Sequence, residues 1–225
     1  MPLLYHNIDS RVESFSTEKD SELPYHVIQS HQTHSDGIAI ITDPCITRED
    51  LEGIDAMITN LKNVAIGART ADCVPILLFD PVHEVIASVH SGWRGTTLRI
   101  CQKTLLKMKE LFGTTPKDVK AIIGPSISVE YFQVGIELVE TFQKEGFPME
   151  LIYSWGGDVI TGDAKTGHHI DLWEANRWLL ENAGLLVDNI HISAICTYKN
   201  NDKLYSARAE KNNKCGRIIN SIKLV

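Results

Sequence analysis

Five short apolar segments rich in β-branched residues follow one another in the first half of the chain, and they limit the folds it can adopt. Turn-forming residues such as Asp80-Pro81 separate them, which is typical of consecutive strands. The two segments on either side of Asp80-Pro81 are close enough in sequence to form a hairpin of Ile76–Asp80 with Glu84–Val89. The five predicted strands are Gly37–Thr42, Ile54–Thr59, Val64–Gly67, Val74–Phe79 and Glu84–His90.

The hydrophobic period changes after these strands. Apolar residues recur every three or four positions over Thr96–Phe112, with basic residues between them, so we predict an amphipathic helix that ends at Gly113. Its apolar positions are Leu98, Cys101, Leu105, Met108 and Leu111.

The second half alternates strand and helix patterns, so the fold class is mixed α/β. Asp171 is placed to cap a helix, whereas the polar segment Arg11–Pro24 is expected to form a surface loop. The further predicted elements are a strand at Lys120–Gly124, helices at Gly135–Glu145 and Leu172–Ala183, and a strand at Ile190–Cys196.

Net charge, hydropathy and cysteine content argue against nucleic-acid binding, membrane insertion and secretion. The chain has 225 residues, with 29 acidic against 22 basic side chains and a net charge of −7, which disfavours a nucleic-acid polymer as partner. No apolar stretch is long enough to span a membrane, no signal-peptide pattern is visible, and the five cysteines include no CxxC pair. We expect one cytoplasmic domain over residues 1–225, without membrane contact.

Side chains that can take part in catalysis or binding gather at the ends of three predicted strands. These segments are Ser30–Ser35, Arg69–Pro75 and His90–Gly95. Within them, His34, Cys73 and His90 are donors that zinc accepts, and three protein ligands leave one position for a water that can attack an electrophilic carbon. Asp72 is a candidate to orient a ligand. Against this, a lone cysteine is often a small buried hydrophobe, and the spacing matches no short zinc signature.

Arginines in loops that contain glycine or serine form a second set of candidates. Guanidinium groups suit phosphate or carboxylate, and Ser91-Gly92 leads into a predicted helix N-terminus, which also favours an anion. Each of these arginines could equally well be a solvated surface residue that binds no ligand. The position of Arg94 beside Trp93 favours a functional role for that residue. These arginines are Arg69, Arg94, Arg208 and Arg217.

Several motifs resemble the laccase-domain, or YfiH-like, family, which has long been labelled multicopper polyphenol oxidase. The resemblance runs from about Gln32 to Arg217, and the blocks around Asp72-Cys73 and His90–Gly95 are its most specific parts. Two departures are that the family's N-terminal pattern is not recognisable in residues 1–30 and that Ser126 stands where a cysteine is frequent. The motifs are Gln32–Ser35, Ile54–Thr59, Thr70–Pro75, His90–Gly95, Ile123–Ile127, Tyr131, Val134-Gly135, Asp171-Leu172, Cys196–Tyr198, Ser206, Arg208 and Gly216-Arg217.

The resemblance implies a layered α/β/β/α sandwich, related to the catalytic domain of cytotoxic necrotizing factor. It also implies a zinc site made of His34, Cys73 and His90, with copper as a possible metal. Two activities are associated with the family. One is copper-dependent phenol oxidation; the other is phosphorolysis of adenosine, inosine and methylthioadenosine together with deamination of adenosine.

Residue content favours the nucleoside activity. Multicopper oxidation needs a three-copper cluster that consumes many histidines, and the nine histidines here include no H-x-H motif. We expect Cys73, His90 and Asp72 to be catalytic, and Arg94, Arg69, Arg208 and Trp93 to bind substrate or phosphate. The alternatives are a copper-dependent polyphenol oxidase, a cysteine hydrolase with Cys73 as nucleophile and His90 as base, and a non-enzymatic protein whose metal is structural.

Overall fold

A six-stranded sheet runs through the centre of the molecule in the computed structural model, which describes residues 3–157, 166–211 and 215–225. Its two middle strands form the predicted hairpin, with Pro75 opposite His90 and Phe79 opposite Ile86. The strand order is β13 (Ile190–Ile192), β9 (Lys120–Ile123), β7 (Val74–Asp80), β8 (Val85–Ser91), β5 (Ile54–Thr59) and β4 (Gly37–Ile40).

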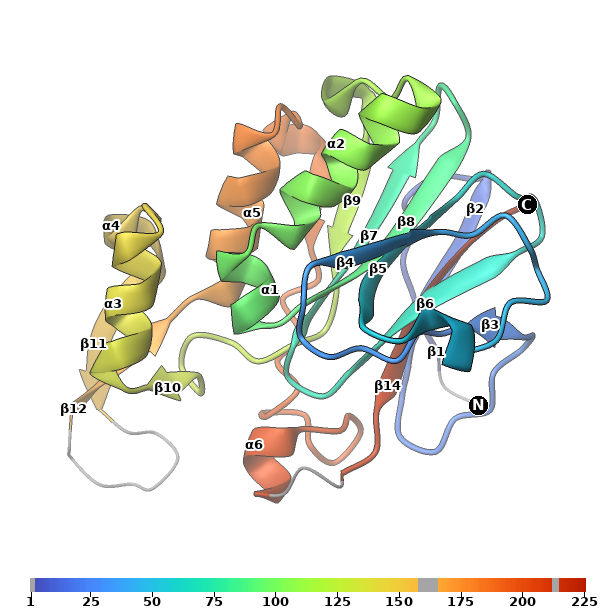
Figure 1. Cartoon of the computed structure of the whole chain (residues 1–225). Helices are drawn as coiled ribbons and strands as arrows, with labels where there is room; N and C mark the ends of the chain where they lie inside the picture. Colours follow the sequence, from blue (N-terminus) through green and yellow to red (C-terminus); the bar gives the residue numbers. More distant parts are fainter. Residues whose placement is uncertain (1–2, 158–165, 212–214) are drawn as a thin grey trace.

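A five-stranded sheet packs on one face of the six-stranded sheet (Figure 1). Its central strands come from both ends of the chain, so residues near the N- and C-termini pair within one sheet. The order is β1 (Leu3–Tyr5), β2 (Val12–Thr17), β14 (Ile218–Leu224), β6 (Ala65–Thr70) and β3 (Val27–Ile28).

Helices cover the other face of the six-stranded sheet, as Figure 1 shows for α1 (Trp93–Thr97), α2 (Ile100–Phe112) and α5 (Leu172–Asn182). The carboxylate of Asp171 accepts hydrogen bonds from two backbone N–H groups at the start of α5, which confirms the predicted cap. Helices, six-stranded sheet and five-stranded sheet therefore stack as successive layers, and the predicted mixed α/β class is confirmed.

The remaining elements lie outside these layers. A small sheet stands beside the helical layer with α3 and α4 (Figure 1), and α6 precedes the last strand. These elements are β10 (Gln133–Val134), α3 (Ile136–Lys144), α4 (Met149–Ile152), β11 (Tyr153–Gly157), β12 (Thr166–Ile170), α6 (Ala207–Glu210), and the short 3-10 turns Glu49–Leu51, Pro116–Asp118 and Val187–Asn189.

Two apolar clusters hold the layers together. One lies between the sheets, where Leu77 and Ile86 meet Ile66 and Ile222. The other lies between the six-stranded sheet and the helices, and it includes Ile76, Leu105 and Leu179. Alternate residues of each central strand therefore face different clusters, as expected for a strand buried on both sides.

The predicted amphipathic helix is interrupted near its start. Arg99 has a left-handed backbone (φ 61°), so α1 ends at Thr97 and α2 begins at Ile100. Leu98 falls in this break and is 41% exposed, and Leu111 in α2 is 50% exposed, so their predicted places on the apolar face were wrong. Gly113 ends α2 as predicted, with a left-handed φ of 77°.

Two other local predictions were also wrong. The segment predicted as a surface loop contains β2, whose Phe15 is buried and which pairs with both β1 and β14. The late strand ends at Ile192, earlier than predicted. The His168-His169 pair lies in β12, where His169 is buried and its Nδ1 donates to the carbonyl of Val129.

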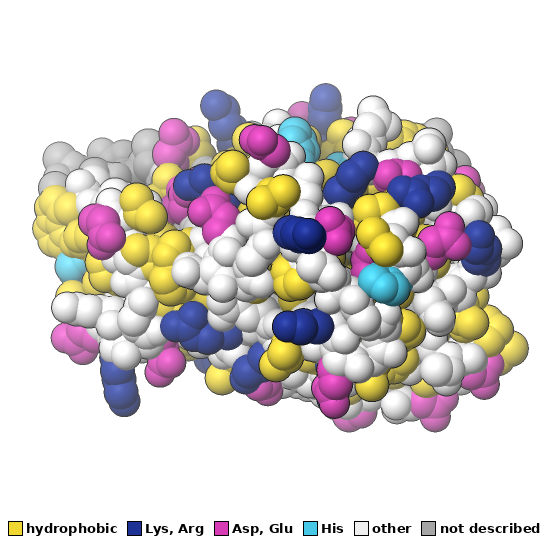
Figure 2. Space-filling view, turned by 90° about the horizontal axis from the view of Figure 1, so that it is seen from above, with side chains coloured by type: hydrophobic (Ala, Val, Ile, Leu, Met, Phe, Trp, Pro, Cys, Tyr) yellow, Lys and Arg dark blue, Asp and Glu magenta, His cyan; other side chains and the backbone are white. Residues whose placement is uncertain are grey.

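Surface charge is mixed on the face seen from above in Figure 2, where basic and acidic side chains alternate with apolar ones. Among the described residues on this face, basic side chains do not form a continuous patch of the kind that binds nucleic-acid backbones. In the part of the chain that the structure describes, none of the helices has the length and apolar character of a membrane span.

Candidate metal centre

Strand register brings the predicted metal-binding residues together. Pro75 on β7 lies opposite His90 on β8, so Cys73, two residues before Pro75, reaches the same sheet end as His90. The parallel pairing of Gly37 with Ile54 brings the loop before β4, which carries His34, to that end as well. Strand pairing therefore brings His34 and Cys73 close together in space, although they are 39 residues apart in the sequence.

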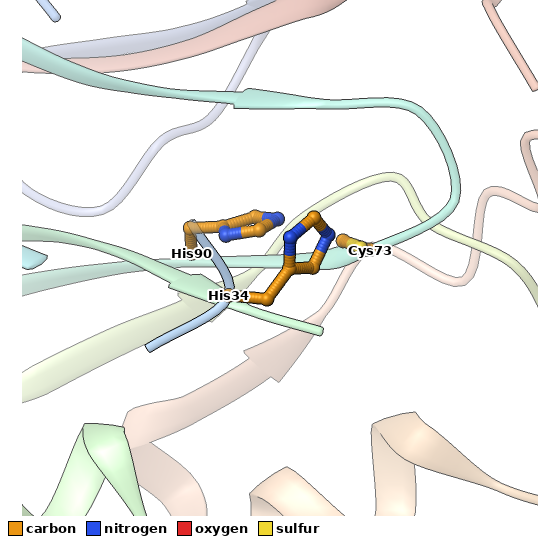
Figure 3. Close-up of side chains that lie close together, drawn as sticks. All are labelled: His34, Cys73 and His90. Atoms are coloured by element: carbon orange, nitrogen blue, oxygen red, sulfur yellow. The ribbon is translucent and has the colours of Figure 1, made fainter. Parts of the chain in front are cut away.

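The three side chains point toward one another (Figure 3). One ligand atom from each of His34, Cys73 and His90 lies within 4.8 Å of the other two. The two imidazole rings meet edge to face, with centroids 4.9 Å apart. Two imidazoles and one thiolate are a donor set that zinc or copper accepts, so these residues fit a metal ion.

Asp55 holds this arrangement, and the sequence prediction missed its role. Its carboxylate accepts a hydrogen bond from His90 Nδ1 at 2.7 Å, so Nε2 is the ring nitrogen left to bind a metal. The same carboxylate accepts the backbone N–H groups of Thr33, His34 and Ser35 at 2.8–3.1 Å. A carboxylate inside the apolar strand Ile54–Thr59 was the available signal, because a buried charge requires partners.

The charges at the site favour a thiolate beside an imidazolium in the metal-free protein. Burial would raise the pKa of Cys73, but His90 and His34 outweigh burial and lower this pKa to about 6. Burial would lower the pKa of His90, but Cys73 and Asp55 raise it to about 9. Metal binding requires a deprotonated cysteine and a neutral histidine, so the shift at Cys73 favours metal binding, whereas zinc must displace the proton held by His90.

Backbone geometry at the site is unusual in two places. His34 has φ 62° and Asp72 has φ 84°, a region that residues other than glycine rarely adopt. Gly92 allows the close packing beside them, because a Cβ at this position would lie 2.8 Å from Cys73 Sγ and 3.3 Å from His34 Cδ2. Such strain is often found at functional sites.

Asp72 lies next to Cys73 but does not orient a histidine. One of its carboxylate oxygens accepts Thr197 Oγ1 and the other accepts the backbone N–H of Arg208, both at 2.7 Å. The orienting role proposed for Asp72 from the sequence belongs to Asp55 in the structure. Asp72 instead ties the segments of Thr197 and Arg208 to the metal-binding loop.

The predicted phosphate-binding residues occupy different environments. Arg94, in α1, is exposed and lies over the ring of Trp93, with Cζ 4.3 Å from its centroid. Arg208 donates to the carbonyl of Tyr131 at 3.0 Å and lies over the ring of Phe132. The third arginine, Arg69, lies half-buried at the end of β6, where its guanidinium donates to Gln29 Oε1 at 3.3 Å.

The motif residue Tyr131 also has a partner. Its ring stacks on that of Tyr198, with centroids 4.5 Å apart and planes 21° from parallel. Ser126, which replaces a frequent cysteine, accepts Trp173 Nε1 at 2.6 Å and donates to the carbonyl of Gly124. Tyr131 and Ser126 both lie in the loop that follows β9, where the first is held by ring stacking and the second by hydrogen bonds.

Curated relatives of the chain are named for nucleoside enzymes. A purine nucleoside phosphorylase of Bacteroides thetaiotaomicron is 40% identical over 218 residues, covering 94% of this chain and 78% of the relative. Adenosine deaminase RL5, from an unknown prokaryotic organism, is 38% identical over 189 residues, covering 81% of this chain and 69% of the relative.

Solved structures share the fold. The hypothetical protein YfiH of Bacillus licheniformis has a TM-score of 0.83 at 24% identity and covers 96% of this chain and 94% of its own. YlmD of Geobacillus stearothermophilus has a TM-score of 0.79 at 21% identity, and the match covers 97% of this chain and 94% of YlmD. The model of the family described as multi-copper polyphenol oxidoreductase laccase matches residues 7–225. The chain therefore belongs to the multi-copper polyphenol oxidoreductase laccase family, of the YfiH type.

Proposed function

We propose that this protein is a zinc-dependent, cytoplasmic purine nucleoside phosphorylase that acts on adenosine, inosine and methylthioadenosine and also deaminates adenosine. The observation that carries the proposal is the convergence of His34, Cys73 and His90 around one point, with Asp55 fixing the histidines. The relatives named purine nucleoside phosphorylase and adenosine deaminase support the choice of substrate.

The protein's own groups are assigned as follows. His34, Cys73 and His90 hold the metal, and zinc, when bound, supplies Lewis acidity at the position that three ligands leave open. Asp55 keeps His90 in the tautomer that presents Nε2. Asp72, beside Cys73, is assigned to proton transfer with the leaving purine or the departing amine.

In phosphorolysis, a phosphate oxygen attacks the anomeric carbon while the bond from that carbon to the purine nitrogen breaks. The purine accepts a proton as it leaves, and the products are the free base and ribose 1-phosphate. Positive side chains stabilise the phosphate, and the candidates from the sequence are Arg69, Arg94 and Arg208. Trp93, partly buried with Arg94 over its ring, is the aromatic candidate on which a purine can stack.

The test is a screen of zinc-loaded protein against adenosine, inosine and methylthioadenosine, each with and without phosphate. Inosine should give hypoxanthine and ribose 1-phosphate only when phosphate is present. The Cys73→Ala variant should lose both the metal and turnover. Absence of product with all three nucleosides would overturn the proposal.

A second candidate function has a specific observation in its favour. Cys73, His90 and Asp55 form a chain of nucleophile, base and orienting carboxylate, the arrangement used by cysteine hydrolases. In that case activity would survive metal chelation and be abolished by alkylation of Cys73. Loss of turnover on chelation, with recovery on adding zinc, would exclude this alternative.

A further inference from the structure

Two arginines converge at the end of β3 (Val27–Ile28). Arg48 Nε donates to the carbonyl of Ser30 at 3.2 Å. Arg69 Nη1 donates to the side-chain oxygen of Gln29, the preceding residue, at 3.3 Å. Partners on consecutive residues therefore bring these guanidinium groups to the same place.

A third arginine joins them through the five-stranded sheet. Ile219 on β14 pairs with Arg69 on β6, and Arg217 lies just before β14. Arg217 Nη1 donates to the carbonyls of Cys215 at 2.5 Å and Gly216 at 3.0 Å, which restrains its side chain at this end of the sheet. The pKa of Arg69 is lowered, first by burial and then by the charges of Arg48 and Arg217, in agreement with this proximity.

The positive charge of this cluster is not balanced within the described parts of the chain. In residues 3–157, 166–211 and 215–225, neither Arg48, Arg69 nor Arg217 forms an ion pair with a carboxylate. By contrast, Arg11 and Arg177 do have carboxylate partners. Like charges held close together repel one another, and a bound anion relieves that repulsion.

The cluster is attached to the metal centre by two short pieces of chain. Gln32, two residues before His34, exchanges two hydrogen bonds with the backbone of Arg69, at 2.8 and 2.9 Å. Arg69 itself lies four residues before Cys73. An anion held by the arginines would therefore lie on the same two segments that carry the metal-binding side chains.

We propose that Arg48, Arg69 and Arg217 form a binding site for inorganic phosphate, which enters the site as the second substrate. The inference rests on the proposed function, in which phosphate attacks the nucleoside. It assigns phosphate to these three arginines and leaves Arg94, which lies over Trp93, and Arg208, which is held by Tyr131, to other contacts. Guanidinium groups match the geometry of phosphate oxygens and bind them bidentately.

The test measures phosphate binding and phosphate dependence in separate experiments. Calorimetric titration with inorganic phosphate, without nucleoside, is carried out on the wild type and on Arg48→Gln and Arg217→Gln. Arg48, which is exposed, and Arg217, which lies just before β14, are chosen because Arg69 is half-buried within β6 and its replacement risks the fold. Arg177→Gln, which removes an arginine paired with Glu174 on α5, is the matched control.

Each cluster variant should weaken phosphate binding, and raise the KM for phosphate, by about tenfold or more, with the KM for inosine little changed. Arg177→Gln should match the wild type, and Cys73→Ala should retain phosphate binding while losing turnover. Unchanged phosphate affinity in Arg48→Gln and Arg217→Gln would overturn the inference even if phosphorolysis occurs. Conversely, weakened binding in these variants without nucleoside cleavage would support a phosphate-binding site at these arginines but reject both the proposed function and the role of phosphate as second substrate.

Discussion

His90 Nδ1 lies 2.7 Å from Asp55 Oδ1, and the same carboxylate accepts the backbone N–H of His34 at 3.1 Å. One buried side chain therefore positions two of the three metal-binding residues, although they lie on different strands and loops. Burial would raise the pKa of Asp55, but hydrogen bonds from His90 and Ser35 keep this pKa below its usual value. The carboxylate thus stays charged, as its role requires.

Asp55→Asn should weaken metal binding by about 10- to 100-fold, the usual effect of losing the carboxylate partner of a metal-binding histidine. The amide is close in shape to the carboxylate but cannot accept all of its hydrogen bonds. Competition with a chromophoric chelator measures the affinity for zinc. An affinity equal to that of the wild type would show that Asp55 does not position the metal-binding residues.

The matched control is Asp80→Asn. Asp80 is also buried and also bonds a histidine, His83 Nδ1, at 2.8 Å, but it lies at the other end of the hairpin of β7 and β8. Its replacement should lower the free energy of unfolding and leave the affinity for zinc unchanged.

Metal retention should depend on pH through Cys73 and His90. Because the pKa of Cys73 in the metal-free protein is lowered from 9.0 to about 6, its thiolate persists well below the pH at which an ordinary cysteine is protonated. Zinc needs a neutral His90 as well as the thiolate, so the affinity for zinc should fall as the pH drops below about 9, where His90 is protonated. It should fall more steeply below about 6, where the thiol also forms. The difference in ultraviolet thiolate absorbance between the metal-free wild type and Cys73→Ala gives the midpoint, and a midpoint near 9 would contradict the assignment.

Gly92→Ala should disrupt the site without unfolding the protein. Its new Cβ would lie 2.8 Å from Cys73 Sγ, so the sulfur or the loop must move. We expect a loss of zinc affinity of at least about tenfold, since a displaced first ligand affects the site at least as much as a lost supporting residue. Gly156→Ala is the control, because a Cβ there meets no atom within 4 Å.

A buried polar network that joins Ser91 and Thr96 to α5 should contribute to the free energy of unfolding. Asn176 on α5 accepts Ser91 Oγ at 2.7 Å and donates to Thr96 Oγ1 at 3.1 Å and to the carbonyl of Leu172. Asn176→Ala leaves these buried groups without partners and should lower the free energy of unfolding by about 2–4 kcal/mol. Asn182→Ala, on the exposed side of the same helix, should change it by no more than about 0.5 kcal/mol in urea denaturation.

The central strands were predictable from the sequence because they are buried on both faces and bounded by turns. β5, β7 and β8 lie where the pattern predicts them. The break at Arg99 was not predictable, because the helical period of apolar residues continues through it. β2 was missed because its polar residues, Ser14 and Ser16, are buried through hydrogen bonds across the sheet and between side chains.

The metal-binding residues were named from their chemistry and from family resemblance, and the structure places them together. Their supporting residues were not, because a hydrogen bond between Asp55 and His90 depends on strand order, which the sequence pattern leaves open. Arg69 and Arg217 were named as anion-binding candidates, but Arg48 was not, and the proximity of the three was missed for the same reason. Arg48, Arg69 and Arg217 lie far apart in sequence and meet through the five-stranded sheet and the loop after β3.

The most direct test of the central claim is the formation of hypoxanthine from inosine and phosphate by the wild type after removal of metal and stepwise return of zinc. We expect no product from the metal-free protein, and turnover that rises until one zinc is bound per chain. Cys73→Ala should not recover at any zinc concentration. Equal turnover with and without metal, or full activity in Cys73→Ala, would contradict the zinc-dependent mechanism.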